Sequence, residues 1–388
     1  MNKRQALFER GRNLIASFFE KKSKSVVGID IGSSSIKVVQ LRKSHGRAIL
    51  ETYGELSLGP YAGLSVGQAT NLPEEKLSEA LLDIIREANV TTHNGAFSIP
   101  LASSLVVVIE IPTVVGGNLE EMVSIEARRY VPVPISEVAL EWRIIPEETS
   151  NESEEEELPT NGVLSPKSTS TKRTYSKVLI AAIHNETISK YQAIAQKSAI
   201  DASFIEIETF SSMRSLLGME QGTVLILDIG AGATKLSIIE RGVIAKTHII
   251  NRGSQDMTIS LSQSHGVDIA KAETIKREVG LSKELVHQGH SETMNLVISS
   301  IFTEANSTIF DYEKKRHRVI DKVILSGGGS LLFGILEIAK KNFETQVVYA
   351  DPFSKIDSPA FLEPVLKMAG PNFAVATGVA FRKLQELE

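Results

Sequence analysis

The chain has 388 residues, of which 42% are hydrophobic and 23% charged, so it can bury two substantial cores and has an ordinary globular composition. Its formal net charge of −5 gives no global attraction to nucleic acid, which is therefore not an expected partner. It contains no cysteine, which excludes disulfides and thiolate metal sites.

The N-terminal residues 1–24 place apolar side chains at helical spacing among lysines and arginines, which predicts a basic amphipathic helix. Such a helix either contacts an anionic membrane surface peripherally or packs on its own protein or a partner. No apolar run approaches the roughly 20 residues of a membrane-spanning helix, and no secretory signal is recognisable. We therefore expect a cytoplasmic protein.

The following segments alternate between strand and helix patterns, which favours an α/β architecture. Strands are predicted at 26–40, where a Gly/Ser turn interrupts them, and at 95–111, 138–145, 178–183, 224–240, 319–325 and 346–349. Helices are predicted at 77–88, 120–130, 188–199 and 210–217. Residues 146–175 are rich in Glu, Ser, Thr and Pro with few large apolar side chains, which predicts a disordered loop inside a domain.

Two short sequences nearly repeat each other, and each is predicted to lie at a turn between two apolar strands. Asp30-Ile-Gly-Ser-Ser-Ser-Ile-Lys37 and Asp228-Ile-Gly-Ala-Gly-Ala-Thr-Lys235 share Asp, Ile, Gly and Lys at identical offsets. Small residues let the backbone approach a ligand, and successive amides in a tight turn suit phosphate oxygens. An aspartate tolerates phosphate there only if a hard cation such as Mg²⁺ lies between them. One copy is more typical of an ordinary hairpin, but two copies predict duplicated domains facing a shared cleft.

A third element is the run Gly327-Gly-Gly-Ser330, between a predicted strand and a predicted helix. Bare backbone at such a run lets a flat ring or a ribose lie against it. Tight packing between the strand and the helix is the alternative explanation for the three glycines.

With these three elements, the chain resembles the actin, heat-shock chaperone and sugar kinase superfamily over nearly its whole length. The resemblance implies an α/β, actin-like (ribonuclease H-like) duplicated two-lobe fold with an inserted small subdomain, which binds ATP and Mg²⁺. It implies that Asp30 and Asp228 orient Mg²⁺ through water. The other nucleotide-binding residues that it implies are Gly32, Ser33, Ser34, Lys37, Gly230, Ala231, Gly232, Thr234, Lys235, Gly327, Gly328, Gly329 and Ser330.

Two further segments carry the resemblance. Ala272-Glu-Thr-Ile-Lys276 is similar to the segment whose Glu and Lys contact the ribose, which points to Glu273 and Lys276; a solvated helical ion pair is the alternative. Ile205-Glu-Ile-Glu-Thr-Phe210 resembles the connection in which a Glu-Pro pair positions the attacking water, which makes Glu208 the implied catalytic residue. Because Thr209 replaces that proline, we expect ATP binding with at most slow hydrolysis.

The same resemblance divides the chain into parts. We expect an N-terminal helix at 1–24, a first lobe at 25–95 and 186–220, an inserted subdomain at 96–185, a second lobe at 221–365, and a C-terminal return to the first lobe at 366–388.

Within the superfamily, residues 119–138 and the C-terminal segment 373–381 resemble the PilM family of type IV pilus assembly proteins. That family shares its small subdomain with the division protein FtsA. FtsA carries a C-terminal amphipathic membrane helix, whereas this chain ends in Leu384-Gln-Glu-Leu-Glu388, which favours PilM. An FtsA-like filament-forming protein is the alternative, and a sugar-kinase-like phosphotransferase ranks last.

Membership of the PilM family would imply an ATP-binding scaffold of a type IV pilus or type II secretion platform, held at the inner membrane by its partners. The expected partner is the cytoplasmic peptide of a PilN-like bitopic membrane protein, with other platform proteins and self-association as further options. The peptide would lie in a groove near Glu126, Arg129, Tyr130 and Val131. Tyr130 and Val131 would equally suit the core at a helix end.

Overall fold

The structure, a computed structural model, describes residues 25–112, 119–146, 175–218, 222–281 and 288–387. The predicted N-terminal helix and nearly all of the predicted disordered loop lie outside these described residues. The chain forms two compact units: a larger one, described from 25 to 104 and from 186 to 387, and a smaller one, Leu105–Asn185. The smaller unit begins after the strand at 94–99, because that strand pairs with the first sheet of the larger unit.

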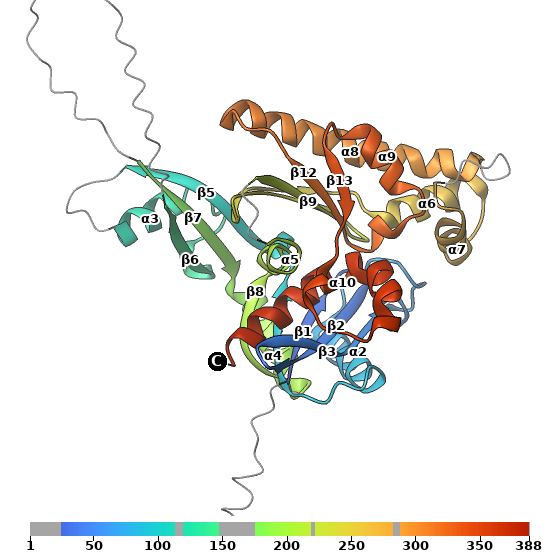
Figure 1. Ribbon diagram of the computed structural model, residues 1–388, viewed down its shortest axis with the longest axis horizontal. Coiled ribbons are helices and arrows are strands. Elements are labelled where there is room, and N and C mark those ends of the chain that lie inside the picture. Colours follow the sequence, from blue (N-terminus) through green and yellow to red (C-terminus); the bar gives the residue numbers. More distant parts are fainter. Residues whose placement is uncertain (1–24, 113–118, 147–174, 219–221, 282–287, 388) are drawn as a thin grey trace, which may run out of the picture. The chain divides into compact units, whose positions relative to one another are not determined.

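The first sheet of the larger unit has the strand order β3-β2-β1-β4-β8 (Figure 1). Its strands are β1 (Ser25–Ile31), β2 (Ser35–Ser44), β3 (Arg47–Ser57), β4 (Asn94–Ile99) and β8 (Asp201–Ile207). The first three form an antiparallel meander, and β4 and β8 extend the sheet in parallel with β1. The predicted strand-turn-strand unit at 26–40 is therefore confirmed.

The second sheet repeats this arrangement with the order β11-β10-β9-β12-β13. Its strands are β9 (Thr223–Ile229), β10 (Thr234–Glu240), β11 (Val243–Ile250), β12 (Lys322–Ser326) and β13 (Gln346–Tyr349). Again the first three are antiparallel and the last two run parallel to the central strand. This repetition confirms the duplicated α/β fold that the two similar turns predicted.

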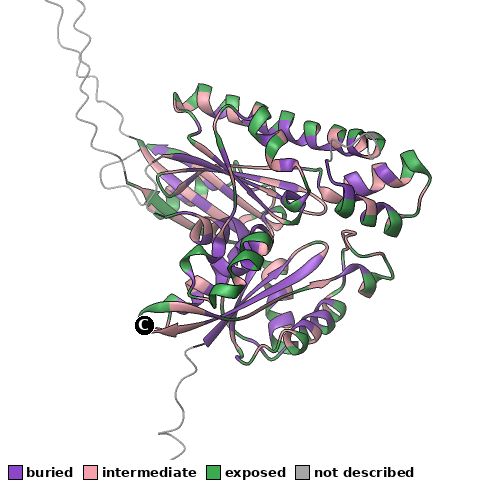
Figure 2. Cartoon of the chain, turned by 45° about the vertical axis from the view of Figure 1, so that its right-hand side comes forward, coloured by how far each residue is buried: buried purple, intermediate pink, exposed green. Residues whose placement is uncertain are grey.

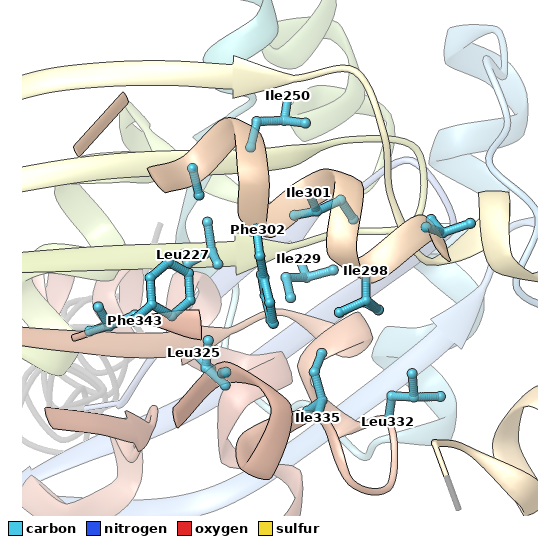
Figure 3. Close-up of a cluster of buried hydrophobic side chains, with 14 of the residues drawn as sticks. Leu227, Ile229, Ile250, Ile298, Ile301, Phe302, Leu325, Leu332, Ile335 and Phe343 are labelled. Atoms are coloured by element: carbon cyan, nitrogen blue, oxygen red, sulfur yellow. The ribbon is translucent and has the colours of Figure 1, made fainter. Parts of the chain in front are cut away.

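Helices cover the two sheets of the larger unit, and buried residues concentrate in the strands of these sheets (Figure 2). The helices are α2 (Glu74–Glu87), α4 (Asn185–Lys197), α5 (Glu208–Leu216), α6 (Ser254–His265), α7 (Ile269–Val279), α8 (Gln288–Arg316), α9 (Ile335–Asn342) and α10 (Glu363–Gln385). The core of the second sheet joins Leu227 and Ile229 of β9 to Phe302 of α8 and Phe343 after α9 (Figure 3). None of the helices that the structure describes combines the length and apolar character needed to cross a membrane.

The C-terminal helix α10 packs against β1, β2, β4 and α5. Two glycines permit this packing, because a Cβ at Gly28 would overlap the Ala376 carbonyl and a Cβ at Gly378 would overlap the Ser211 backbone. The last part of the chain therefore belongs to the first sheet, and its N-terminal half reaches the cavity described below.

The smaller unit has a three-stranded sheet with the order β5-β7-β6. It contains β5 (Ser104–Pro112), α3 (Leu119–Ala127), β6 (Val138–Ile145) and β7 (Tyr175–His184). Its core includes Ile109, Val123, Val178 and Ile180. The smaller unit also contains the short 3₁₀ turn η3 (Ile135–Glu137). The larger unit contains η1 (Gly59–Ala62), η2 (Leu101–Ser103), η5 (Gly328–Leu331), η6 (Pro352–Lys355) and η7 (Ala360–Leu362).

Candidate functional site

A cavity of about 300 Å³ lies in the larger unit and is lined from both sheets. Most of the residues predicted to bind nucleotide line it: Asp30, Gly32, Ser33, Ser34, Lys37, Glu208, Asp228, Gly230, Ala231, Lys235, Glu273, Lys276, Gly327, Gly328 and Gly329. These residues are far apart in the sequence, and they meet because turns of both sheets line the same cavity.

The two similar turns have the same backbone geometry. In the first, the Gly32 amide donates to the Ser35 carbonyl at 3.0 Å, and in the second the Gly230 amide donates to the Ala233 carbonyl at 3.0 Å. Each aspartate lies directly opposite the lysine of its own repeat, since Asp30 pairs with Lys37 across β1 and β2. Asp228 pairs with Lys235 in the same way across β9 and β10.

The first turn presents a carboxylate and an ammonium group to the cavity. Asp30 is 9% exposed, and its Oδ1 accepts a hydrogen bond from the Ser98 hydroxyl at 2.7 Å. Lys37 donates to the Ser35 hydroxyl at 2.9 Å and lies 3.8 Å from Glu55. The adjacent Ser33 and Ser34 line the cavity through the short connection between β1 and β2.

The second turn places its polar side chains on two faces. Lys235 points into the cavity, whereas the Thr234 hydroxyl donates to the Arg252 carbonyl at 2.8 Å and is not among the lining groups. Neighbouring side chains of a strand point to opposite faces of the sheet, so Thr234 and Lys235 cannot both line the cavity. Gly232 packs near Ala69 and Ser33 and also lies outside the lining.

Glu208, the implied catalytic residue, begins α5 and is 6% exposed. Its Oε1 accepts from the Leu101 amide at 2.7 Å, and its Oε2 accepts from the Lys235 ammonium at 3.0 Å. Burial raises the pKa of Glu208 above its ordinary value, although Lys235 opposes this. Burial would lower the pKa of Lys235, but Glu208 and Asp228 outweigh it and raise that pKa.

Glu273 and Lys276 of α7 form an ion pair of 2.6 Å. The pair is not solvated, since the two residues are only 5% and 6% exposed. Glu273 also accepts from the Thr258 hydroxyl at 2.7 Å and from Arg277 at 2.7 Å. Burial lowers the pKa of Lys276, and Glu273 only partly restores it.

The glycine run forms the start of η5. Gly327 has a φ of 81°, and a Cβ there would overlap the Asp228 carboxylate. Gly329 is crowded by Ile229, so bare backbone is required at both positions. Ser330 turns away from the lining, because its hydroxyl donates to the Gly327 carbonyl at 2.7 Å.

Several lining residues were not among those predicted from the sequence. They are Ser35, Glu55, Gly67, Ser254, Met257, Arg277, Ser326, Leu331, Leu332, Pro371, Asn372, Ala374 and Val375. Asn372 shows why: it lies in α10, and its amide donates to Glu55 of β3 at 2.6 Å. Only the folded path of the chain brings these two residues together. Arg277, next to the predicted Lys276, is the one that spacing along α7 could have suggested.

The predicted peptide-binding residues belong to the smaller unit. Tyr130 is 44% exposed, whereas Val131 is 7% exposed and packs with Val138 and Ala182. Arg129 pairs with Glu126 at 2.7 Å. Val131 is therefore a core residue, and Tyr130 and Arg129 are available on the surface of this unit.

Two sheets of identical topology, with matching turns lining a common cavity, define an actin-like fold. Solved structures show the same fold: the chain aligns with MreB 5 of Spiroplasma citri bound to AMPPNP at a TM-score of 0.50 and 11% identity, over 94% of this chain and 98% of that one. It aligns with a chain of a PilM-PilN type IV pilus biogenesis complex at a TM-score of 0.74 and 21% identity, over 92% of this chain and 98% of that one.

The family described as "Type IV pilus assembly protein PilM" matches residues 28–160 and 162–384. The chain belongs to this family, which confirms the resemblance inferred from the sequence.

More distant relatives are cell division proteins. FtsA of Neisseria meningitidis serogroup B is 24% identical over 209 residues, which are 48% of this chain and 50% of that protein. The chain thus spans about half the length of that relative. FtsA of Pseudomonas aeruginosa is 22% identical over 366 residues, which are 85% of this chain and 84% of that protein.

Proposed function

We propose that this protein is an ATP-binding scaffold of a type IV pilus assembly platform and docks the cytoplasmic peptide of a PilN-like membrane protein. The observation that carries the nucleotide part is the pair of matching turns, each with an aspartate opposite a lysine, that line one cavity. Family membership supports the role in pilus assembly. That role would place the protein at the cytoplasmic face of the inner membrane, through its partners.

The lining fits a nucleotide at both ends of the cavity. At one end, backbone amides around Gly32 and Gly230 and the Lys37 ammonium are suited to phosphate oxygens. At the other, the buried Glu273–Lys276 pair offers polar contacts for ribose hydroxyls. An added Cβ at Gly327 or Gly329 would meet Asp228 or Ile229, so tight packing within the protein explains these two glycines. Bound ATP would bias the protein toward one conformation, to which a partner then binds better.

The charges of the lining support a requirement for Mg²⁺. Five carboxylates and four cationic side chains line the cavity: Asp30, Glu55, Glu208, Asp228 and Glu273 against Lys37, Lys235, Lys276 and Arg277. A polyphosphate therefore meets no net positive charge unless a cation accompanies it. In the described part of the chain, no group of three or more His, Asp or Glu side chains is placed to hold a metal ion. Asp30 and Asp228 would accordingly hold Mg²⁺ through water, and phosphate would supply the remaining ligands.

The surface of the smaller unit around Tyr130 is the proposed peptide site. Tyr130 combines an exposed ring with a polar hydroxyl, and Ile125 of the neighbouring helix is 56% exposed. Aromatic residues of this kind commonly anchor interfaces. Support also comes from the solved PilM-PilN complex, whose fold this chain shares.

Calorimetry with the cytoplasmic peptide of a PilN-like protein, in the presence of Mg-ATP, tests the partner. We expect Tyr130→Ala to weaken binding by about ten-fold or more, as removal of an aromatic anchor does. Phe310→Ala removes a more exposed ring, 63% exposed, from the larger unit and serves as the control. Equal losses in both variants, or no binding by the unmodified protein, would refute this site.

A filament-forming role like that of the FtsA relatives is the second candidate, favoured by the match over 85% of this chain. Sedimentation of the protein with Mg-ATP separates the two proposals. Filaments would favour this candidate, and their absence at high protein concentration would count against it.

A further inference from the structure

The two matching turns hold their lysines in the same register but give them different partners. Lys37 donates to the Ser35 hydroxyl at 2.9 Å, and its ammonium group lies 3.8 Å from Glu55, beyond hydrogen-bond distance. Lys235 donates to the Glu208 carboxylate at 3.0 Å and lies 3.4 Å from Asp228. The sequence repeat is therefore symmetric in residue type and asymmetric in chemistry.

Glu208 is held at both oxygens by groups of the protein. The Leu101 amide donates to Oε1 at 2.7 Å, and Lys235 donates to Oε2 at 3.0 Å. The residue is 6% exposed, so its interaction with an ammonium group is far less screened than it would be in water. Replacing Lys235 with a water molecule as the partner of Oε2 would leave a buried carboxylate without its counter-ion, which is unfavourable.

We propose that Lys235 restrains turnover by holding the Glu208 carboxylate in an ion pair, so that this carboxylate does not position or deprotonate a water molecule at the nucleotide. The inference rests on the proposed nucleotide-binding function. Lys235 is in this sense a positioning residue that acts through Glu208, while Lys37 of the first turn is the lysine left to contact phosphate.

The chemistry at issue is ordinary hydrolysis. A water oxygen forms a bond to the γ-phosphorus, and the bond from that phosphorus to the β,γ-bridging oxygen breaks. ADP leaves with the electron pair, and a nearby carboxylate accepts the proton of the water. The hydrogen bonds from Leu101 and Lys235 favour the ionised form of Glu208 and so make it a weaker base for that proton.

Single-turnover hydrolysis of Mg-ATP and calorimetric affinity for a non-hydrolysable ATP analogue are measured together. K235M should raise the hydrolysis rate by about ten-fold or more at a pH high enough to keep Glu208 ionised, because the variant removes the charge that opposes the effect of burial on the pKa of Glu208. K235M should lose less affinity for the analogue than K37M, which should lose about ten-fold or more. K235R, which keeps a positive charge opposite Glu208, should gain much less rate than K235M, and adding E208Q to K235M should abolish the gain.

A second readout needs no nucleotide. Urea unfolding measures the free energy of unfolding of K235M, E208Q and the double variant. The loss in K235M/E208Q should be smaller than the sum of the losses in the two single variants. If K235M does not fold, K235A is used throughout, since its side chain likewise cannot donate to Glu208.

An unchanged hydrolysis rate in the Lys235 variant, or a loss of affinity as large as that of K37M, would overturn the inference. Additive effects in the urea series would overturn it as well. Failure of the unmodified protein to bind the analogue has a different meaning, because it would remove the proposed nucleotide function itself.

Discussion

Adjacent glycines in the lining of the cavity differ in whether they can be replaced by a larger residue. Gly327 lies in the left-handed region with a φ of 81°, against the Asp228 carboxylate and the Ile229 carbonyl. At the neighbouring Gly328, an added Cβ would meet only the end of the Asn372 side chain, at 3.1 Å. Two adjacent glycines therefore differ sharply in what a methyl group would meet.

We predict that Gly327→Ala lowers the free energy of unfolding by more than about 1 kcal/mol, because φ is strained and a Cβ displaces Asp228. Its affinity for Mg-ATP should fall as well. Gly328→Ala is the control and should change both quantities little, since the Asn372 side chain can move. Urea unfolding and calorimetry measure the two effects; equal behaviour of the two variants would contradict this account of the turn.

Glu273 gives a prediction about pH. Burial by itself raises its pKa, but Lys276, Arg277 and Thr258 outweigh burial and hold the pKa below the ordinary value of 4.5. A carboxyl whose pKa is lowered on folding stabilises the fold above its unfolded-state pKa, and that contribution is lost as pH falls through the lowered value.

Glu273→Gln should therefore lower the free energy of unfolding at neutral pH by about 1–3 kcal/mol. The difference from the unmodified protein should shrink as the pH is lowered below 4.5, the ordinary value for the carboxyl. Urea unfolding over a pH series measures this. Glu87→Gln, on an exposed side chain 72% accessible, is the control and should show no such trend. A difference that stays constant with pH would show that the ion pair is not its source.

At the scale of elements, the segment 58–70, which includes η1, connects the two lobes of the larger unit. Its ends are tied to the first turn, since the Leu58 amide donates to the Ser34 carbonyl at 2.9 Å and the Thr70 amide to the Ser33 carbonyl at 2.7 Å. Close to its C-terminal end the segment reaches the second lobe, where the Ala69 amide donates to the Gln255 side chain of α6 at 2.8 Å. This segment is thus placed to keep the cavity closed.

Gly67 allows the segment to lie close to Glu273, because a Cβ added at Gly67 would lie only 2.7 Å from the Glu273 carboxylate. Gly67→Ala should speed the release of a fluorescent ATP analogue several-fold in stopped-flow experiments. Gly63→Ala is the matched control: Gly63 also has positive φ, 69°, but nothing lies within 4 Å of an added Cβ. Equal release rates for Gly67→Ala and Gly63→Ala would mean that the segment does not hold the cavity closed.

At the scale of the whole molecule, local patterns predicted the duplication, and together with the family resemblance they predicted more than half of the residues that line the cavity. The repeated Asp-to-Lys segments determine their own turns, so their register could be inferred without tertiary contacts. The face of each side chain could not be inferred from similarity of motifs alone: Thr234 precedes Lys235 on β10 and points away from the cavity. Asn372 and Glu55 were not predictable, because only the return of α10 to the first sheet brings them together.

The central claim is that the two turns form one site for Mg-ATP, and calorimetric titration with Mg-ATP tests it most directly. The unmodified protein should bind with a stoichiometry of one, and chelating the cation should weaken binding, because the lining carries no net positive charge. Asp228→Asn should weaken binding by about ten-fold or more, while Asp201→Asn, at an exposed position outside the cavity, should not. No binding by the unmodified protein, or unchanged affinity in Asp228→Asn, would contradict the account.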